Sequence, residues 1–235
     1  MKQNNPCTLI LVLDLATEDD VFSILDSVGD SIRWVKVGLQ LYLRYGSALV
    51  EAIASRGYHI FLDLKLHDIP NTVAAAIHNL QGMPIKMLTL HTAGGSEMLR
   101  RAREAQQQAL PETQLLGVTV LTSMNQASLD EIGCKYAVEQ QVTRLAQLAM
   151  DAGIQGLVCS PMELLPLRNL LGEHPILVTP GIRPTGSQSD DQKRIMTPAQ
   201  AAAAGSSYIV VGRPILQASN RRDAALAILE ELATQ

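Results

Sequence analysis

Residues 59–72 read HIFLDLKLHDIPNT, and the first half of this stretch alternates as a β-strand does. One face of the strand carries four aliphatic side chains, Ile60, Leu62, Leu64 and Leu66. The other face carries Phe61, Asp63 and Lys65, so a carboxylate and an ammonium group share it. Asp68 follows the end of the strand, where a nearby proline suits a turn into a helix. An amine flanked by two carboxylates keeps its proton and can deliver it, which suits general acid catalysis.

A lone Asp-x-Lys pair on a strand is more often a structural ion pair, because structural networks also perturb pKa values. Two features of this pair favour a catalytic role. Both charges lie opposite four aliphatic side chains, and a third charge, Asp68, follows where the strand ends. A structural ion pair at the rim of a barrel remains the alternative.

The composition is typical of a globular protein and argues against several classes. Of 235 residues 47% are hydrophobic, and the formal net charge is −4, with acidic and basic residues mixed. No basic run is interleaved with aromatic residues, which argues against nucleic-acid binding, and no apolar run is long enough for a membrane span. Cys7, Cys134 and Cys159 form no CxxC motif, so neither a disulfide framework nor a zinc site is expected. The N-terminal region lacks a signal-type cleavage site, and we expect a cytoplasmic protein.

Strand-like and helix-like segments alternate along the chain. Besides the central strand, strands are predicted over residues 8–15, 34–39, 86–92, 114–123, 156–160, 175–179 and 207–211. Helices are predicted over about 17–28, 41–56, 71–80, 96–109, 128–133, 138–152, 162–171, 197–204 and 220–232, with Thr17 and Asn220 as caps. Eight strands and eight helical units without a linker-like break predict an α/β fold, a single (β/α)8 TIM barrel over residues 1–235. A doubly wound open sheet is the competing fold, but no G-x-G-x-x-G follows the first strand.

Polar residues recur where the predicted strands end, which is where barrels of this kind place their active sites. In chain order these residues are Asp14, Lys36, Asp63, Lys65, His91, Thr122 and Ser123. Each of these residues alone is more often structural, so it is their convergence on one rim that indicates an active site. Asp63 and Asp68 could hold Mg²⁺, but Lys65 between them would compete for both carboxylates, and we expect no metal site.

The segments after the seventh and eighth strands indicate a phosphate site. They read TPGIRP over residues 179–184 and VVGRP over 210–214, and barrels often bind phosphate with these two loops. Gly212 lets backbone N–H groups approach an anion, while Arg183 and Arg213 offer planar donor groups. The intervening stretch RPTGSQSDDQKR, residues 183–194, has no aliphatic residue and is either a solvated surface loop or a lid.

These motifs together resemble the orotidine 5′-phosphate decarboxylase family of the bacterial type, and the resemblance covers the whole chain. The motifs are LDL at Asp14, KVG at Lys36, DLKLHDIPNT over 63–72, LTS over 121–123, TPGIRP at Arg183, Gln192 in the lid and VVGRPI at Arg213. The family converts orotidine monophosphate to uridine monophosphate, the last step of pyrimidine nucleotide synthesis. The resemblance implies the same reaction here, without a metal or an organic cofactor.

The resemblance also implies roles for the charged residues. Lys65 would protonate carbon 6 of the pyrimidine as carbon dioxide leaves, and Asp63 would lie near the substrate carboxylate and help to hold Lys65. Lys36 would complete the charged network and contact the ribose, and Asp14 would bind a ribose hydroxyl. Decarboxylation leaves negative charge on a ring carbon, which an ammonium group stabilises and then neutralises with its proton.

Two further residues, Asp68 and Thr72, would reach into the site of a neighbouring subunit, so the resemblance implies a homodimer with shared sites. The other implied substrate-binding residues are Thr122 and Ser123 at the base, and Arg183, Gln192, Gly212 and Arg213 at the phosphate.

Two other functions stay open on the sequence alone. A sugar-phosphate barrel enzyme with a D-x-K-x-x-D core, such as a 3-keto-gulonate-phosphate decarboxylase or a hexulose-phosphate synthase, would need Mg²⁺, and the HDIPNT and VVGRPI motifs fit it less well. The second alternative is a catalytically silent barrel that only binds nucleotides. Burying charged residues costs free energy, so an intact set of them argues against a protein that only binds. Formation of uridine monophosphate without metal would discriminate among the three.

Overall fold

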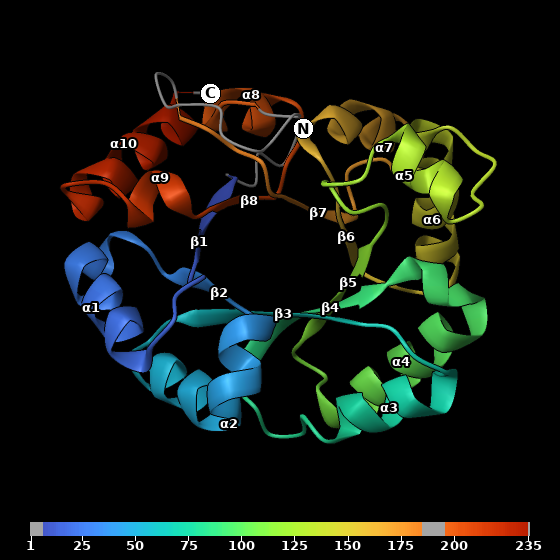
Figure 1. Cartoon of the computed structure of the whole chain (residues 1–235), viewed down its shortest axis with the longest axis horizontal. Helices are drawn as coiled ribbons and strands as arrows, with labels where there is room; N and C mark the ends of the chain where they lie inside the picture. Colours follow the sequence, from blue (N-terminus) through green and yellow to red (C-terminus); the bar gives the residue numbers. More distant parts are fainter. Residues whose placement is uncertain (1–6, 185–195, 235) are drawn as a thin grey trace.

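A closed barrel of eight parallel strands forms the centre of the computed structural model, which describes residues 7–184 and 196–234 (Figure 1). The strands follow one another in chain order, and the last pairs with the first. They are β1 Thr8–Val12, β2 Trp34–Gly38, β3 His59–Leu66, β4 Ile85–His91, β5 Gln114–Val118, β6 Gly156–Val158, β7 Ile176–Thr179 and β8 Tyr208–Val211. The predicted (β/α)8 barrel is thereby confirmed. The single domain over residues 1–235 stays a prediction, since residues 1–6, 185–195 and 235 lie outside those described.

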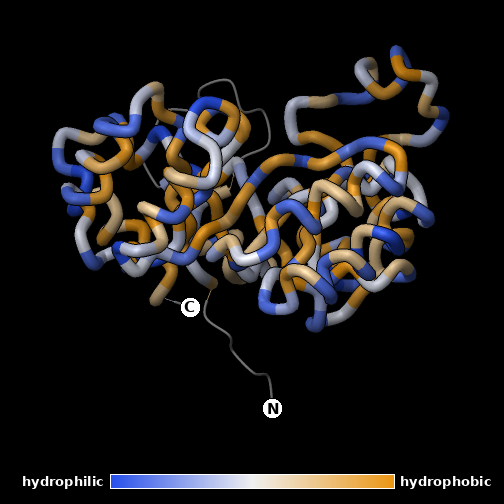
Figure 2. Tube along the Cα trace, turned by 90° about the horizontal axis from the view of Figure 1, so that it is seen from below, coloured by the Kyte–Doolittle hydropathy of each residue, from blue (hydrophilic) through white to orange (hydrophobic). Residues whose placement is uncertain are grey.

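Helices surround the barrel on its outer side (Figure 1). They are α1 Glu18–Val28, α2 Leu39–Ser55, α3 Pro70–His78, α4 Gly95–Ala109, α5 Gln126–Glu131, α6 Val138–Asp151, α7 Leu164–Leu171, α8 Pro198–Ala203, α9 Arg213–Leu216 and α10 Arg221–Ala233, with 3-10 turns η1 Gly29–Ser31, η2 Thr92–Gly94 and η3 Pro161–Glu163. Hydrophobic and hydrophilic residues alternate along the helical turns, as expected of helices that bury one face (Figure 2). None of these described helices is long and apolar enough to cross a membrane.

The two predicted helix caps are confirmed. The side chain of Thr17 accepts a hydrogen bond from the backbone N–H of Asp20, and that of Asn220 accepts one from Asp223. Each cap satisfies a backbone donor that the first helical turn leaves without a partner.

Several strands end earlier than the sequence predicts. β1 ends at Val12 and β5 at Val118, so Asp14 and Thr122 lie in the loops that follow these strands. β5 stops because the last residues of both neighbouring strands, His91 of β4 and Val158 of β6, already pair with Val118. Beyond that point the chain has no partner strand, and apolar residues alone do not extend a sheet. The short helix α9 was not predicted.

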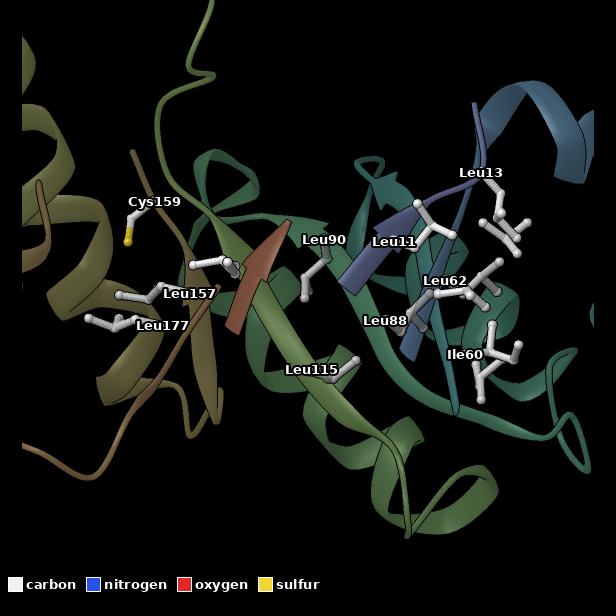
Figure 3. Close-up of a cluster of buried hydrophobic side chains, with 14 of the residues drawn as sticks. Leu11, Leu13, Ile60, Leu62, Leu88, Leu90, Leu115, Leu157, Cys159 and Leu177 are labelled. Carbon is white, nitrogen blue, oxygen red and sulfur yellow. The ribbon is translucent and has the colours of Figure 1, made fainter. Parts of the chain in front are cut away.

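Alternating side chains of the strands build two apolar cores. Those facing outward pack against the helices, and Figure 3 shows a set of them: Leu11, Leu13, Ile60, Leu62, Leu88, Leu90, Leu115, Leu157 and Leu177. Those facing inward fill the barrel: Ile10, Val12, Phe61, Met87, Leu116, Val178 and Val210. The predicted alternation of β3 is therefore confirmed. Because Asp63 and Thr89 lie two residues beyond Phe61 and Met87, they face inward one layer above this apolar floor.

Candidate active site

The strand β3 departs from regular pairing where it reaches the mouth of the barrel. Leu62 pairs with Leu88 of β4, whereas Leu66 pairs with Leu90, so β3 holds extra residues relative to β4. Lys65 lies in this bulge with a φ of 50°, the one non-glycine residue with positive φ among those described. Bulges redirect side chains, and non-glycine residues in the left-handed region cluster at functional sites.

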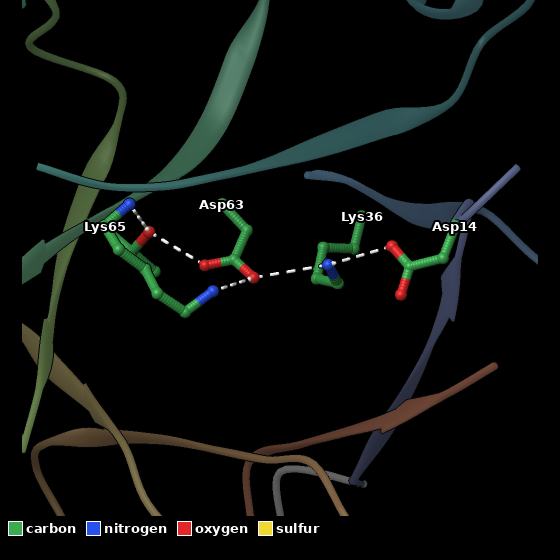
Figure 4. Close-up of polar contacts among 5 residues, drawn as sticks. Asp14, Lys36, Asp63 and Lys65 are labelled. Atoms are coloured by element: carbon green, nitrogen blue, oxygen red, sulfur yellow. Dashed lines mark hydrogen bonds and ion pairs between the residues drawn. The ribbon is translucent and has the colours of Figure 1, made fainter. Parts of the chain in front are cut away.

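A row of alternating charges crosses the barrel mouth beside this bulge (Figure 4). The Nζ atom of Lys65 lies 2.7 Å from Oδ2 of Asp63, and Nζ of Lys36 lies 3.2 Å from the same oxygen. Lys36 also approaches Oδ1 of Asp14 at 3.5 Å. Asp63 is buried, whereas the side chain of Asp14 is 62% exposed, so the row extends from the barrel interior toward solvent.

The carboxyl group of Asp63 has a shifted pKa. Burial by itself raises that pKa, but the charges of Lys36 and Lys65, with hydrogen bonds from Lys65 and Thr89, outweigh burial and lower it below its ordinary value. Asp63 is therefore ionised at neutral pH. The site thus holds a buried carboxylate in contact with two ammonium groups, which can stabilise negative charge developing beside them.

A pocket of about 320 Å³ opens over this row at the carboxyl ends of the strands. Eight of the predicted site residues line it: Asp14, Lys36, Asp63, Lys65, Thr122, Arg183, Gly212 and Arg213. Ser123 is not part of this lining, and Gln192 lies outside the described residues. Apolar side chains such as Val158 and Val210 complete the walls. An apolar pocket with a few convergent polar groups is typical of a small-molecule site.

The two arginines reach this pocket from β7 and β8, across the barrel from β3 (Figure 1). Arg183 is buried in the loop after β7 and donates a hydrogen bond to the carbonyl of Ile182 at 3.0 Å. Gly212 precedes Arg213, and a Cβ at this glycine would lie 3.3 Å from Cβ of Val12. The glycine thus allows close packing of the β8 end against β1, beside the two guanidinium groups.

The prediction of a lysine between two carboxylates is wrong for the single chain. Within the described residues Lys65 has its ion pair with Asp63, and the structure instead places Asp63 between two lysines. Asp68 is exposed, and its carboxylate accepts a hydrogen bond from the backbone N–H of Ile69 at 2.6 Å. Thr72 in α3 is also exposed, and neither residue lines the pocket of its own barrel. The physical reason is that β3 ends at Leu66, and the following turn no longer follows the barrel wall.

Thr89, a fully buried residue of β4, also belongs to this network and is not among the residues predicted from the sequence. Its hydroxyl donates to Oδ1 of Asp63 at 2.9 Å and accepts from the backbone N–H of Lys65 at 2.8 Å. The available signal was strand alternation, which places Thr89 on the inward face that also carries His91. His91 does not line the pocket; burial, with His67 and Lys65 nearby, lowers its pKa.

Across residues 7–184 and 196–234, no cluster of three or more His, Cys, Asp or Glu side chains has the arrangement of a metal site.

Fold and site together define a class: a (β/α)8-barrel enzyme whose pocket combines carboxylate, ammonium and guanidinium groups at the carboxyl ends of the strands. Residues 8–228 match the model of the orotidine 5′-phosphate decarboxylase / HUMPS family. The chain belongs to this family, as its motifs predict.

Relatives resemble the chain over nearly its full length. The orotidine 5′-phosphate decarboxylase of Opitutus terrae is 53% identical, over 96% of this chain and 98% of the relative. The orotidine 5′-phosphate decarboxylase of Gluconobacter oxydans is 50% identical, over 96% of this chain and 97% of the relative. The crystal structure of orotidine 5′-phosphate decarboxylase from Lactobacillus acidophilus matches with a TM-score of 0.87 at 38% identity, over 96% of this chain and 99% of that one.

Proposed function

We propose that the protein decarboxylates orotidine 5′-phosphate to uridine 5′-phosphate and carbon dioxide in de novo pyrimidine synthesis. Family membership and the near full-length similarity to bacterial orotidine 5′-phosphate decarboxylases support this activity. The observation that carries it is the row of Lys65, Asp63 and Lys36 in a pocket that also holds Arg183 and Arg213. The row suits charge developing on a ring, and the arginines suit a phosphate.

In this proposal Lys65 is the proton donor. Carbon dioxide departs without the bonding electron pair, which stays on carbon 6 of the pyrimidine. The ammonium group of Lys65 stabilises that charge and then transfers its proton to the carbon, forming the new C–H bond. Asp63, 2.7 Å away, holds the ammonium group in place, and its charge repels a substrate carboxylate bound beside it.

The remaining predicted residues would bind the rest of the substrate. Asp14, at the exposed end of the charge row, and Lys36 beside it are suited to the ribose hydroxyls. We assign the phosphate to Arg183, Gly212 and Arg213, with Gln192, and the base to Thr122, with Ser123. Binding of the phosphate, which is remote from carbon 6, would supply free energy for positioning the pyrimidine ring.

We also propose a homodimer whose sites are shared. Asp68 and Thr72 are exposed and do not line their own pocket, so they are accessible to a second subunit. Aliphatic side chains on the same rim support an interface there, since Ile69 is 66% exposed, Leu39 47% and Leu43 80%. A two-fold axis through this rim would give each site the same residues from its partner.

A cytoplasmic location is part of the proposal. Cys7, Cys134 and Cys159 are all free thiols, which is usual in a reducing compartment.

Treatment with a metal chelator is expected to leave the activity unchanged, because the proposed chemistry uses only side chains. The measurement is the loss of ultraviolet absorbance of orotidine monophosphate with chelator-treated protein, together with identification of uridine monophosphate. Activity that disappears with chelator and returns with Mg²⁺ would move the assignment to metal-dependent sugar-phosphate enzymes. If the protein bound uridine monophosphate but did not convert orotidine monophosphate, it would be a nucleotide-binding barrel without catalytic activity.

Replacing Arg213 with alanine is expected to weaken uridine monophosphate binding about 10- to 100-fold, since a hydrogen bond to a charged group contributes roughly 1.5–3 kcal/mol. Binding of uridine, which lacks the phosphate, should change little. Arg222→Ala is the matched control, because Arg222 is an exposed arginine of the nearby helix α10 and does not line the pocket. Equal losses for uridine monophosphate and uridine would place the phosphate elsewhere.

A further inference from the structure

We propose that Thr89 is a positioning residue for the decarboxylation, because its single hydroxyl fixes both the carboxylate of Asp63 and the backbone of Lys65. The inference rests on the proposed function and deepens it. Thr89 does not line the pocket and touches no reacting atom, so its effect passes through the two residues it holds.

The contacts of Thr89 are short and shielded from water. Its hydroxyl lies 2.9 Å from Oδ1 of Asp63 and 2.8 Å from the backbone nitrogen of Lys65, and the residue is fully buried. Oδ1 is the oxygen that the lysines do not use, because Lys36 and Lys65 both contact Oδ2. The carboxylate is therefore held through both oxygens, which prevents its rotation.

The direction of the hydroxyl proton is decided by its neighbours. A backbone N–H is only a donor, so the Thr89 oxygen must accept from Lys65. The one hydroxyl proton is then available to Asp63, whose ionised carboxylate is only an acceptor. A hydrogen bond to a charged acceptor is stronger than a neutral one, and the bond received from Lys65 polarises the hydroxyl further.

The second contact bears on the bulge in β3. Lys65 has a φ of 50°, and register between β3 and β4 is lost between Leu62 and Leu66. A backbone N–H that leaves the ladder needs another acceptor, and the Thr89 oxygen supplies it. Without this acceptor a buried donor would be left without a partner, and the bulge that directs Lys65 toward Asp63 would lose its anchor.

A purely structural threonine provides the matched control. Thr113 is also buried, and its hydroxyl donates to the carbonyl of Ile85 at 2.8 Å, at the opposite end of the barrel from the site. Thr113→Val removes a buried hydroxyl without touching Asp63 or Lys65. It therefore reports what the loss of a threonine hydroxyl does to stability alone.

The test compares Thr89→Val, Thr89→Ser and Thr113→Val with wild type, measuring kcat, KM and the thermal midpoint of unfolding. Thr89→Val is expected to lower kcat by about 10- to 100-fold with KM within about threefold, because the reacting groups are misplaced while substrate contacts remain. Thr89→Ser keeps the hydroxyl and should retain kcat within about threefold of wild type. Thr113→Val should lose stability but not kcat.

The inference is overturned if Thr89→Val has the same kcat as Thr113→Val, or if Thr89→Val changes only KM. It is also overturned if Thr89→Ser loses as much kcat as Thr89→Val. If Thr89→Val does not fold, Thr89→Ala decides between the same outcomes. An inactive wild type would overturn the proposed function itself, whereas an active wild type with an unchanged Thr89→Val overturns only the role of Thr89.

Discussion

Replacing Lys65 with alanine is expected to lower kcat by about 10⁴-fold or more while leaving a folded protein that still binds uridine monophosphate. The variant loses both the charge that stabilises carbon 6 and the proton that neutralises it. Asp63 keeps its contacts with Lys36 at 3.2 Å and Thr89 at 2.9 Å, so the buried carboxylate is not left without partners. Alanine adopts a φ of 50° no more easily than lysine does, so the substitution relieves little backbone strain.

Single-turnover kinetics and nucleotide titration of the same preparation would separate chemistry from binding. Lys86→Ala is the matched control, because Lys86 is an exposed lysine in the first half of β4 and does not line the pocket. Turnover within about tenfold of wild type in Lys65→Ala would remove Lys65 as the acid, since general acid catalysis contributes at least about 10²-fold.

Lys65→Ala and Asp68→Ala are each expected to be inactive, and mixing them under conditions that exchange subunits is expected to restore roughly a quarter of wild-type activity. In each mixed dimer one site lacks both residues. The other site has Lys65 from one chain and Asp68 from its partner, and is therefore intact. Random pairing makes about half of the dimers mixed, and half of their sites are active.

The control mixture pairs Lys65→Ala with Asp63→Ala. These two residues lie 2.7 Å apart within one chain, so every site of a mixed dimer lacks one of them and no activity should return. Mass spectrometry of the exchanged dimers establishes that mixed species are present. If the first mixture then stays as inactive as the control, Asp68 serves its own chain and the shared-site proposal fails, while the role of Lys65 is unaffected.

The sequence was sufficient for the architecture and for most of the pocket lining. Alternation of apolar and polar residues is a local property, and it predicted strands and helices in the observed order. Parallel strands bring their carboxyl ends to one rim, so polar residues near the ends of successive strands were expected to converge, as Asp14, Lys36 and Asp63 do. The glycine and arginine that follow β8 were found by the same reasoning.

Only the tertiary structure decided how the charges pair and what holds them. Thr89 lies 26 residues from Asp63 in the chain, and the bulge that turns Lys65 toward Asp63 depends on pairing with β4. A linear motif placed Lys65 between two acids, whereas the fold of the single chain places Asp63 between two lysines. The reason is that local periodicity says which face a side chain occupies, while contacts between strands set where each strand ends and which atoms meet.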